Sequence, residues 1–155
     1  MTLPIGVTAS AVDALRDKIR ALLPAAPATD AVLVFDGPDP ARAFAARAVT
    51  VGEPFQEDQE AVAEDRVESG ARPNVRTTWT VAGSVYVGGG VVSMETHRDA
   101  ASAILSAIDA GLRADRTLGG AVHLARLGSA QWLQGRDDKG AGVANGYTVE
   151  LIRLS

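Results

Sequence analysis

His97 and Asp99 come closest to a catalytic pair in this sequence. A histidine and a carboxylate can form an oriented general base when their side chains face each other. Residues two apart on a helix do not face each other, so this pair is badly placed to cooperate. Asp99 is better explained as a first-turn carboxylate that offsets the helix dipole. His123 falls on the polar side of a predicted strand, where a surface position is expected. The sequence therefore predicts no catalytic residues.

Other residues with chemical potential have simpler explanations. Gly88-Gly89-Gly90 could cradle a phosphate, but the lysine and hydroxyl residue of a phosphate-binding loop do not follow it. Asp137 and Asp138 could attract a divalent cation, but the alternating ligands and closing glutamate of a calcium loop are missing. The chain has no cysteine and two histidines. We therefore expect no cofactor-binding and no metal-binding residues.

The two tryptophans are expected to differ. Trp79 shares a predicted strand face with valines, which indicates core packing. Trp132 has no such context, and stacking on a base or a sugar stays open for it.

An acidic segment follows the middle of the chain. Between Glu53 and Asp65 lie six carboxylates and no basic residue, so this segment carries a charge of −6, and the other residues sum to +2, which gives the net charge of −4. Because burying unpaired carboxylates is very costly, we expect a solvent-exposed loop, extending over residues 53–73. The carboxylates are Glu53, Glu57, Asp58, Glu60, Glu64 and Asp65. A second polar segment, expected at the tip of a hairpin, consists of Arg136, Asp137, Asp138 and Lys139.

Length and composition limit the classes of protein. A chain of 155 residues with 46% hydrophobic residues fits one compact domain spanning 1–155. It contains no apolar run near the roughly 20 residues that cross a bilayer, and no secretory signal is recognisable. The net charge of −4 argues against general nucleic-acid binding.

The hydrophobic periodicity predicts two helices and several strands. The first helix is expected from Ser10, with Asp13 completing a capping box, to Pro24. The second helix is expected over 97–114. Strands are expected over 31–35 (buried on both faces), 44–51, 75–87 (with a bulge or a bend at Gly83), 121–127, 130–134 and 147–154, with a long hairpin loop over 135–146. This pattern favours an α+β fold, in which two helices pack on one face of a mostly antiparallel twisted sheet.

Several segments, taken in chain order, carry a family resemblance. They are LRDKIRALL, AVLVFDGPDP, NVRTTWTVAGSVYVGGG, HRDAASAILSAIDAGLRAD, TLGGAVHLARLGSAQWLQ and GYTVELIRL. In this order the chain resembles the tail terminator proteins (minor tail or tail completion proteins) of long-tailed bacteriophages, prophages and gene-transfer particles. The acidic segment has no counterpart in that pattern.

The resemblance implies a non-enzymatic structural protein. Its subunits would form a ring, expected to be a hexamer, that caps the tail tube, ends tail polymerisation and offers a surface to the head. The implied partners are further copies of the chain, the major tail tube protein and a head completion protein, with DNA passing through the lumen without specific binding. The implied location is the head-proximal end of the virion tail, after assembly in the host cytoplasm.

Two other functions stay open. A head–tail joining protein of the same particle (a stopper or an adaptor) has a similar length and composition. A small hotdog-like enzyme would need a carboxylate or backbone site on its long helix, for which Asp109 and Asp115 are the candidates. For the acidic segment we weigh a solvated loop, a subunit contact, and a negative collar lining the ring lumen that repels DNA phosphates.

Overall fold

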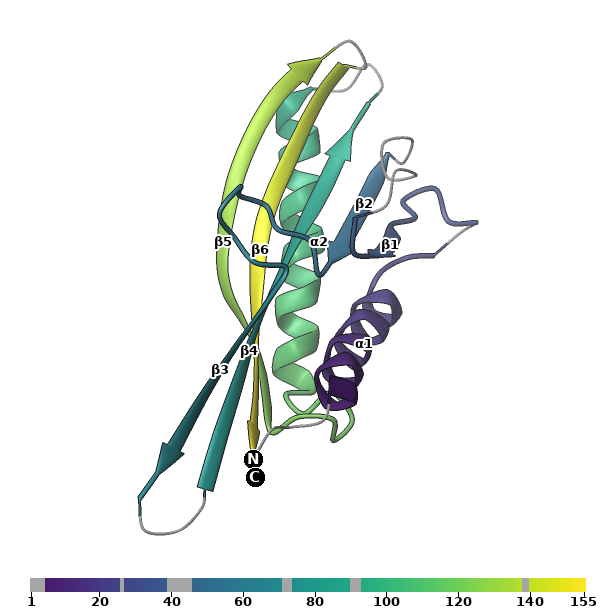
Figure 1. Cartoon of the computed structure of the whole chain (residues 1–155). Coiled ribbons are helices and arrows are strands. Elements are labelled where there is room, and N and C mark those ends of the chain that lie inside the picture. The colour runs from purple at the N-terminus through teal and green to yellow at the C-terminus, as the bar shows by residue number, and fades with distance from the viewer. Residues whose placement is uncertain (1–4, 26, 39–45, 71–73, 90–92, 138–139) are drawn as a thin grey trace.

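Six strands form one mixed sheet, and two helices pack against it (Figure 1). The computed structural model describes residues 5–25, 27–38, 46–70, 74–89, 93–137 and 140–155. The strand order is β1-β2-β4-β6-β5, with β3 beside β4. Only β1 and β2 are parallel; the other described pairs are antiparallel. The strands are β1 (Leu33–Asp36), β2 (Arg47–Val51), β3 (Val62–Ser69), β4 (Asn74–Gly88), β5 (Leu124–Asp137) and β6 (Gly140–Leu154). The predicted α+β class is confirmed.

The helices both begin earlier than predicted. In α1 (Ile5–Leu22), Ser10 lies inside the helix, so the predicted capping box with Asp13 is wrong. In α2 (Met94–Ala114), the N-cap is Ser93, whose side-chain oxygen accepts a hydrogen bond from the Thr96 amide at 3.3 Å. Asp99 therefore lies beyond the first turn, where the helix dipole has less effect, and its predicted role at the helix start is wrong.

The core lies between the helices and one face of the sheet. Residues of β4 alternate as predicted, and Trp79, Val81 and Val85 are fully buried. Leu15 of α1 and Ile108 of α2 belong to the same cluster. Successive strand residues point to opposite faces, so the odd-numbered residues of β4 make one apolar surface that the helices cover. The prediction that Trp79 is a core residue is confirmed.

Gly83 does not form a bulge in β4. Its pairings with Val51 and Tyr147 continue the register of both neighbouring strands without interruption. A Cβ atom here would collide with the Thr50 carbonyl oxygen and the Tyr147 ring. Glycine is therefore required because the tyrosine ring lies across this position, and of the two predicted alternatives the bulge is wrong.

The final hairpin is much longer than predicted. Paired residues extend from Leu124↔Ile152 to Asp137↔Gly140, so the loop predicted over 135–146 belongs mostly to β5 and β6. The two strands predicted over 121–127 and 130–134 form the single strand β5, with an irregularity between Leu127 and Ser129. The hydrophobic pattern did not predict the first half of β6, which is rich in glycine and small residues, because backbone pairing needs no particular side chain.

Two edges of the fold also differ from prediction. The segment around β1 was expected to be buried on both faces, but Leu33 is 48% exposed because β1 is the last strand on its side. The strand predicted over 44–51 is β2; residues 44 and 45, and Gly90 after β4, lie outside the described residues. Within the part of the chain that is described, neither helix is long and apolar enough to cross a membrane.

Candidate assembly surfaces

The acidic segment is not one loop. β2 and β3 both pair with β4, one after the other along it, and residues 52–61 leave the sheet between them. We call residues 52–61 the excursion. Backbone hydrogen bonds to Ala82 of β4 hold both of its ends. At the first end, the Ala82 carbonyl oxygen accepts hydrogen bonds from the amides of Gly52 (2.8 Å) and Glu53 (3.0 Å). At the other end, the Ala82 amide donates to the Ala61 carbonyl oxygen at 3.0 Å. The loop predicted over 53–73 is therefore wrong for residues 62–69, which form β3; residues 71–73 lie outside the described residues.

The excursion lies on the sheet face opposite α2, in front of β6 and β5 in the view of Figure 1. Phe55 packs where Gly146 of β6 has no side chain, and a Cβ atom at Gly146 would collide with its ring. Gly146 neighbours Tyr147, which points into the core, so Phe55 must be on the other face. The side-chain amides of Gln56 and Gln131 share a hydrogen bond that ties the excursion to β5. The Gln59 side-chain oxygen accepts a hydrogen bond from the Phe55 amide at 2.8 Å.

The six carboxylates are divided among three environments. Glu53 is buried, with 8% of its surface exposed, so the expectation of a wholly exposed group is wrong for this residue. Its amide donates a hydrogen bond to the Ala82 carbonyl oxygen at 3.0 Å, so Glu53 lies beside β4 at the start of the excursion. The exposed carboxylates of the excursion are Glu57, Asp58 and Glu60. Glu64 and Asp65 are exposed on β3, opposite Trp79 and Thr78 respectively, and so belong to different faces.

The predicted hairpin tip is at the turn of the β5–β6 hairpin. Asp137 pairs with Gly140, which leaves Asp138 and Lys139 between the strands. Asp138 and Lys139 lie outside the described residues, and Arg136 and Asp137 are the last two residues of β5. Because Gly135 pairs with Gly142, the strands stay together up to this end. The tip is therefore a short connection on a long paired hairpin.

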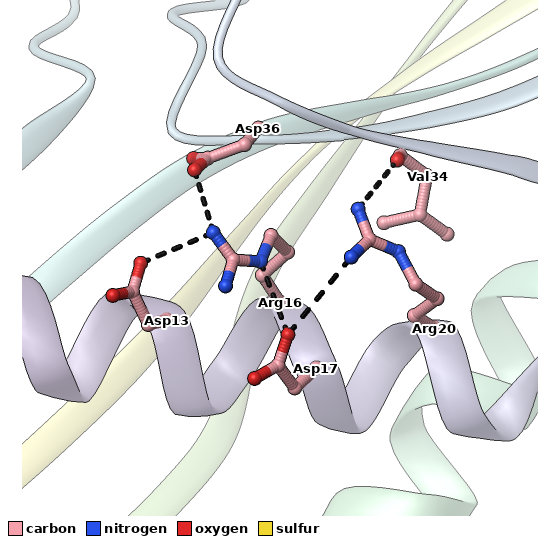
Figure 2. A network of polar contacts seen from close by, with 6 residues as sticks. All are labelled: Asp13, Arg16, Asp17, Arg20, Val34 and Asp36. Carbon is pink, nitrogen blue, oxygen red and sulfur yellow. Dashed lines mark hydrogen bonds and ion pairs between the residues drawn. The ribbon is translucent and has the colours of Figure 1, made fainter.

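A network of arginines and carboxylates joins α1 to β1 (Figure 2). Arg16 donates to Asp36 of β1 at 2.7 Å and to Asp13 and Asp17 of its own helix at 3.2 and 3.1 Å. The hydrogen bond to Asp36 is the main cause that raises the pKa of Arg16 above its ordinary value. One turn later, Arg20 donates to the Val34 carbonyl oxygen at 3.0 Å. The helix thus engages the outer strand on this side of the sheet.

The candidate residues for chemistry are separated. His97 is buried in α2, and His123 is exposed near the start of β5, where its Nδ1 accepts the Leu154 amide at 3.1 Å. Asp109 forms an ion pair with Arg113 at 3.2 Å. Asp115 accepts from the Gly119 amide at 3.1 Å, which is the main cause that lowers its pKa below the ordinary value. Asp115 also contacts Lys18 of α1 at 3.4 Å, so it joins the second helix to the first.

In the described part of the chain, few large apolar side chains are exposed, and three of the four lie on strands at the sheet edges. Among the described residues, the large exposed hydrophobic side chains are Leu33 on β1, Val67 on β3, Trp132 on β5 and Leu154 at the end of β6. Trp132 is 41% exposed, whereas Trp79 is fully buried. The sequence pattern did not predict β3. Its only large apolar residues are Val62 and Val67, which are five positions apart and so do not give the alternation of apolar and polar residues that is typical of a strand. Its strand conformation comes from pairing with β4.

Comparisons with known proteins do not assign a family. No protein-family model matches the chain, and no curated protein matches it. The described residues contain no group of three or more histidine, aspartate or glutamate side chains placed to hold a metal ion. The described structure also has open strand edges, the acidic excursion and the long β5–β6 hairpin.

Proposed function

We propose that this chain is a structural subunit of a long-tailed phage-like particle, and that it forms a ring, expected to be hexameric, that caps the tail tube. The observation that carries the proposal is the order of elements along the fold. An amphipathic helix, a group of strands, a second long helix and a long final hairpin follow one another, as the resemblance to tail terminators implies. The resemblance implies an α/β sandwich-like subunit, and the sheet with its two covering helices is consistent with that.

The division of the molecule into two faces supports a role in assembly. One face of the sheet is covered by α1 and α2, and the other carries the excursion with Glu57, Asp58 and Glu60 exposed. In a ring of identical subunits, one side of every sheet would present these carboxylates. The ring would contact the major tail tube protein on one side and a head completion protein on the other, with DNA passing through its lumen.

Tail-tube polymerisation tests the proposed function. The tail tube protein encoded beside this chain's gene is polymerised with and without the purified chain, and tube lengths are measured by negative-stain electron microscopy. We expect shorter tubes, each with extra density at one end, because a ring bound to the tube end blocks the next tube subunit.

The outcomes separate the alternatives. Unchanged tube lengths with no end-bound density would contradict the tail terminator function. If the chain binds the head completion protein but leaves the tube ends free, the chain is a head–tail joining protein instead. A gene placed beside a hydrolase operon, away from tail genes, would also count against the proposal.

A further inference from the structure

Among the residues that the structure describes, three strands of the sheet have a paired strand on only one side. β1 and β5 end the strand order, and β3 pairs with β4 alone. The edge of β1 is already engaged, because Arg20 of α1 donates to the Val34 carbonyl oxygen and Arg16 donates to Asp36 (Figure 2). The edges of β5 and β3 remain. Since an unpaired strand edge is a template for another strand, these two edges are the natural places for strand pairing between molecules.

The edge of β5 lacks the charges that usually prevent such pairing. Residues 127–135 of this strand include no charged side chain. Gly128, Ser129, Ala130, Gln131 and Trp132 are all exposed. Natural edge strands are commonly protected by lysines, prolines, β-bulges or covering elements. Residues 127–135 include neither lysine nor proline, the irregularity between Leu127 and Ser129 affects only the start of this stretch, and the excursion contacts it through Gln131. An uncharged and exposed strand edge favours pairing with a strand of another molecule.

The edge of β3 has the opposite character. It presents Glu64, Asp65 and Glu68 as exposed carboxylates, together with Val67, which is 52% exposed. Parallel, in-register pairing of β3 with a second β3 would place each of these carboxylates opposite its own copy, which destabilises a cross-strand pair. An uncharged strand flanked by arginines suits it better. In the sequence of β5, Arg126 precedes the uncharged part and Arg136 follows it; Arg126 also forms an ion pair with Glu150 of β6 at 2.7 Å.

The two open edges lie on opposite sides of the sheet. The strands between them are β4 and β6, in the order β3-β4-β6-β5. A contact between β5 of one copy and β3 of the next leaves one open edge at each end, so the contact can repeat. Head-to-tail contacts of this kind close into rings when the rotation between neighbours closes.

We infer that the open edge of β5 on one copy pairs with the open edge of β3 on the next copy, so that the sheets join head to tail around a ring. This inference rests on the ring assembly proposed above, and names the surfaces that form it. Such joining puts the excursion of every copy on the same side of the joined sheets, because the excursion lies on one face of each sheet.

Cysteine cross-linking tests the pairing directly, because the chain has no cysteine of its own. Two single variants are made at exposed positions, Ala130→Cys on β5 and Asp65→Cys on β3, and treated with a short bis-maleimide at high protein concentration. We expect a cross-linked dimer from the mixture of the two variants and only monomer from either variant alone. A dimer from Ala130→Cys alone would mean symmetric β5–β5 pairing and overturn the inference, as would no dimer in the mixture.

An edge-blocking variant gives a second measurement. Ala130→Lys places a charge on the exposed β5 edge, and Ser102→Lys places the same charge on the exposed side of α2 as a matched control. We expect Ala130→Lys to abolish rings in sedimentation while its Tm stays within a few degrees of the parent chain, and Ser102→Lys to form rings. Rings from Ala130→Lys would overturn the inference. Mixed cross-links without any effect on tube length would instead contradict only the proposed function.

Discussion

At the scale of single residues, Tyr147 shows how one contact joins three strands. It pairs with Gly83 of β4, its ring occupies the space above that glycine, and its hydroxyl donates to the Thr50 carbonyl oxygen of β2 at 2.7 Å. The hydroxyl is fully buried, and burial raises its pKa above the ordinary value of 10.0. A neutral Tyr147 is therefore part of the folded state.

The buried hydroxyl predicts a loss of stability at alkaline pH. The folded-state pKa lies above the unfolded-state value, so the contribution of Tyr147 is complete below about pH 10 and falls as the pH rises beyond it. We expect Tyr147→Phe to lower the free energy of unfolding by about 1–3 kcal/mol at neutral pH, because the Thr50 carbonyl loses its donor. Urea unfolding at about pH 8 and about pH 11 measures both effects. If the free energy of unfolding of Tyr147→Phe falls between these two pH values by as much as that of the parent chain, this role of Tyr147 is contradicted.

The two tryptophans give a matched pair of substitutions. Trp79 is fully buried between the sheet and the helices, whereas Trp132 is 41% exposed. We expect Trp79→Ala to lower the free energy of unfolding by about 3–5 kcal/mol, the usual cost of deleting a buried tryptophan. Trp132→Ala should cost less than about 1 kcal/mol, as for most surface changes. Chemical denaturation of both variants measures the difference; equal losses would contradict the burial assigned to Trp79.

At the scale of elements, the excursion is held to the sheet at a few points. Phe55 packs over Gly146, Gln56 bonds to Gln131, and Gly52 and Glu53 both donate to Ala82. Compact loops whose ends lie close together are held mainly by their own side chains. Phe55 is therefore the side chain on which the position of the excursion depends most.

Removing the Phe55 ring should release the excursion while leaving the core folded. We expect Phe55→Ala to increase hydrogen exchange at the amides of Gly52 and Glu53, because local opening no longer costs the apolar contact with β6. The global free energy of unfolding should fall much less than in Trp79→Ala. Hydrogen exchange followed by mass spectrometry measures the effect, with Glu57→Ala, at an exposed position of the same segment, as the control. Unchanged exchange in Phe55→Ala would contradict this anchoring role.

At the scale of the whole molecule, the charges are unevenly distributed. The exposed carboxylates of the excursion lie on the face away from the helices, while α1 balances its own carboxylates with Arg16 and Arg20. In the ring that we propose, a collar of Glu57, Asp58 and Glu60 from each copy would repel DNA phosphates in the lumen.

Charge reversal tests this collar. The triple variant Glu57→Lys, Asp58→Lys and Glu60→Lys makes the net charge of the chain positive and should bind DNA at low salt, with affinity that falls steeply as salt increases. We expect unchanged folding and ring assembly, since the three side chains are exposed, and slower DNA passage through assembled particles. Loss of assembly would instead make the excursion a subunit contact. Normal DNA passage with intact rings would contradict the lumen position.

The sequence alone determined the features that follow from local periodicity. The alternation along β4 and the apolar stripes of α1 and α2 were sufficient to predict the α+β fold and the burial of Trp79, because the side chains that repeat on one face are the ones that leave water. The tertiary structure alone decided the rest. β3 is polar, and β6 begins with glycines and small residues, yet both are strands because β4 and β5 supply their backbone hydrogen bonds. Glu53 is buried, and the edges of β3 and β5 are open, for the same reason: these properties depend on which segments become neighbours, which no local pattern records.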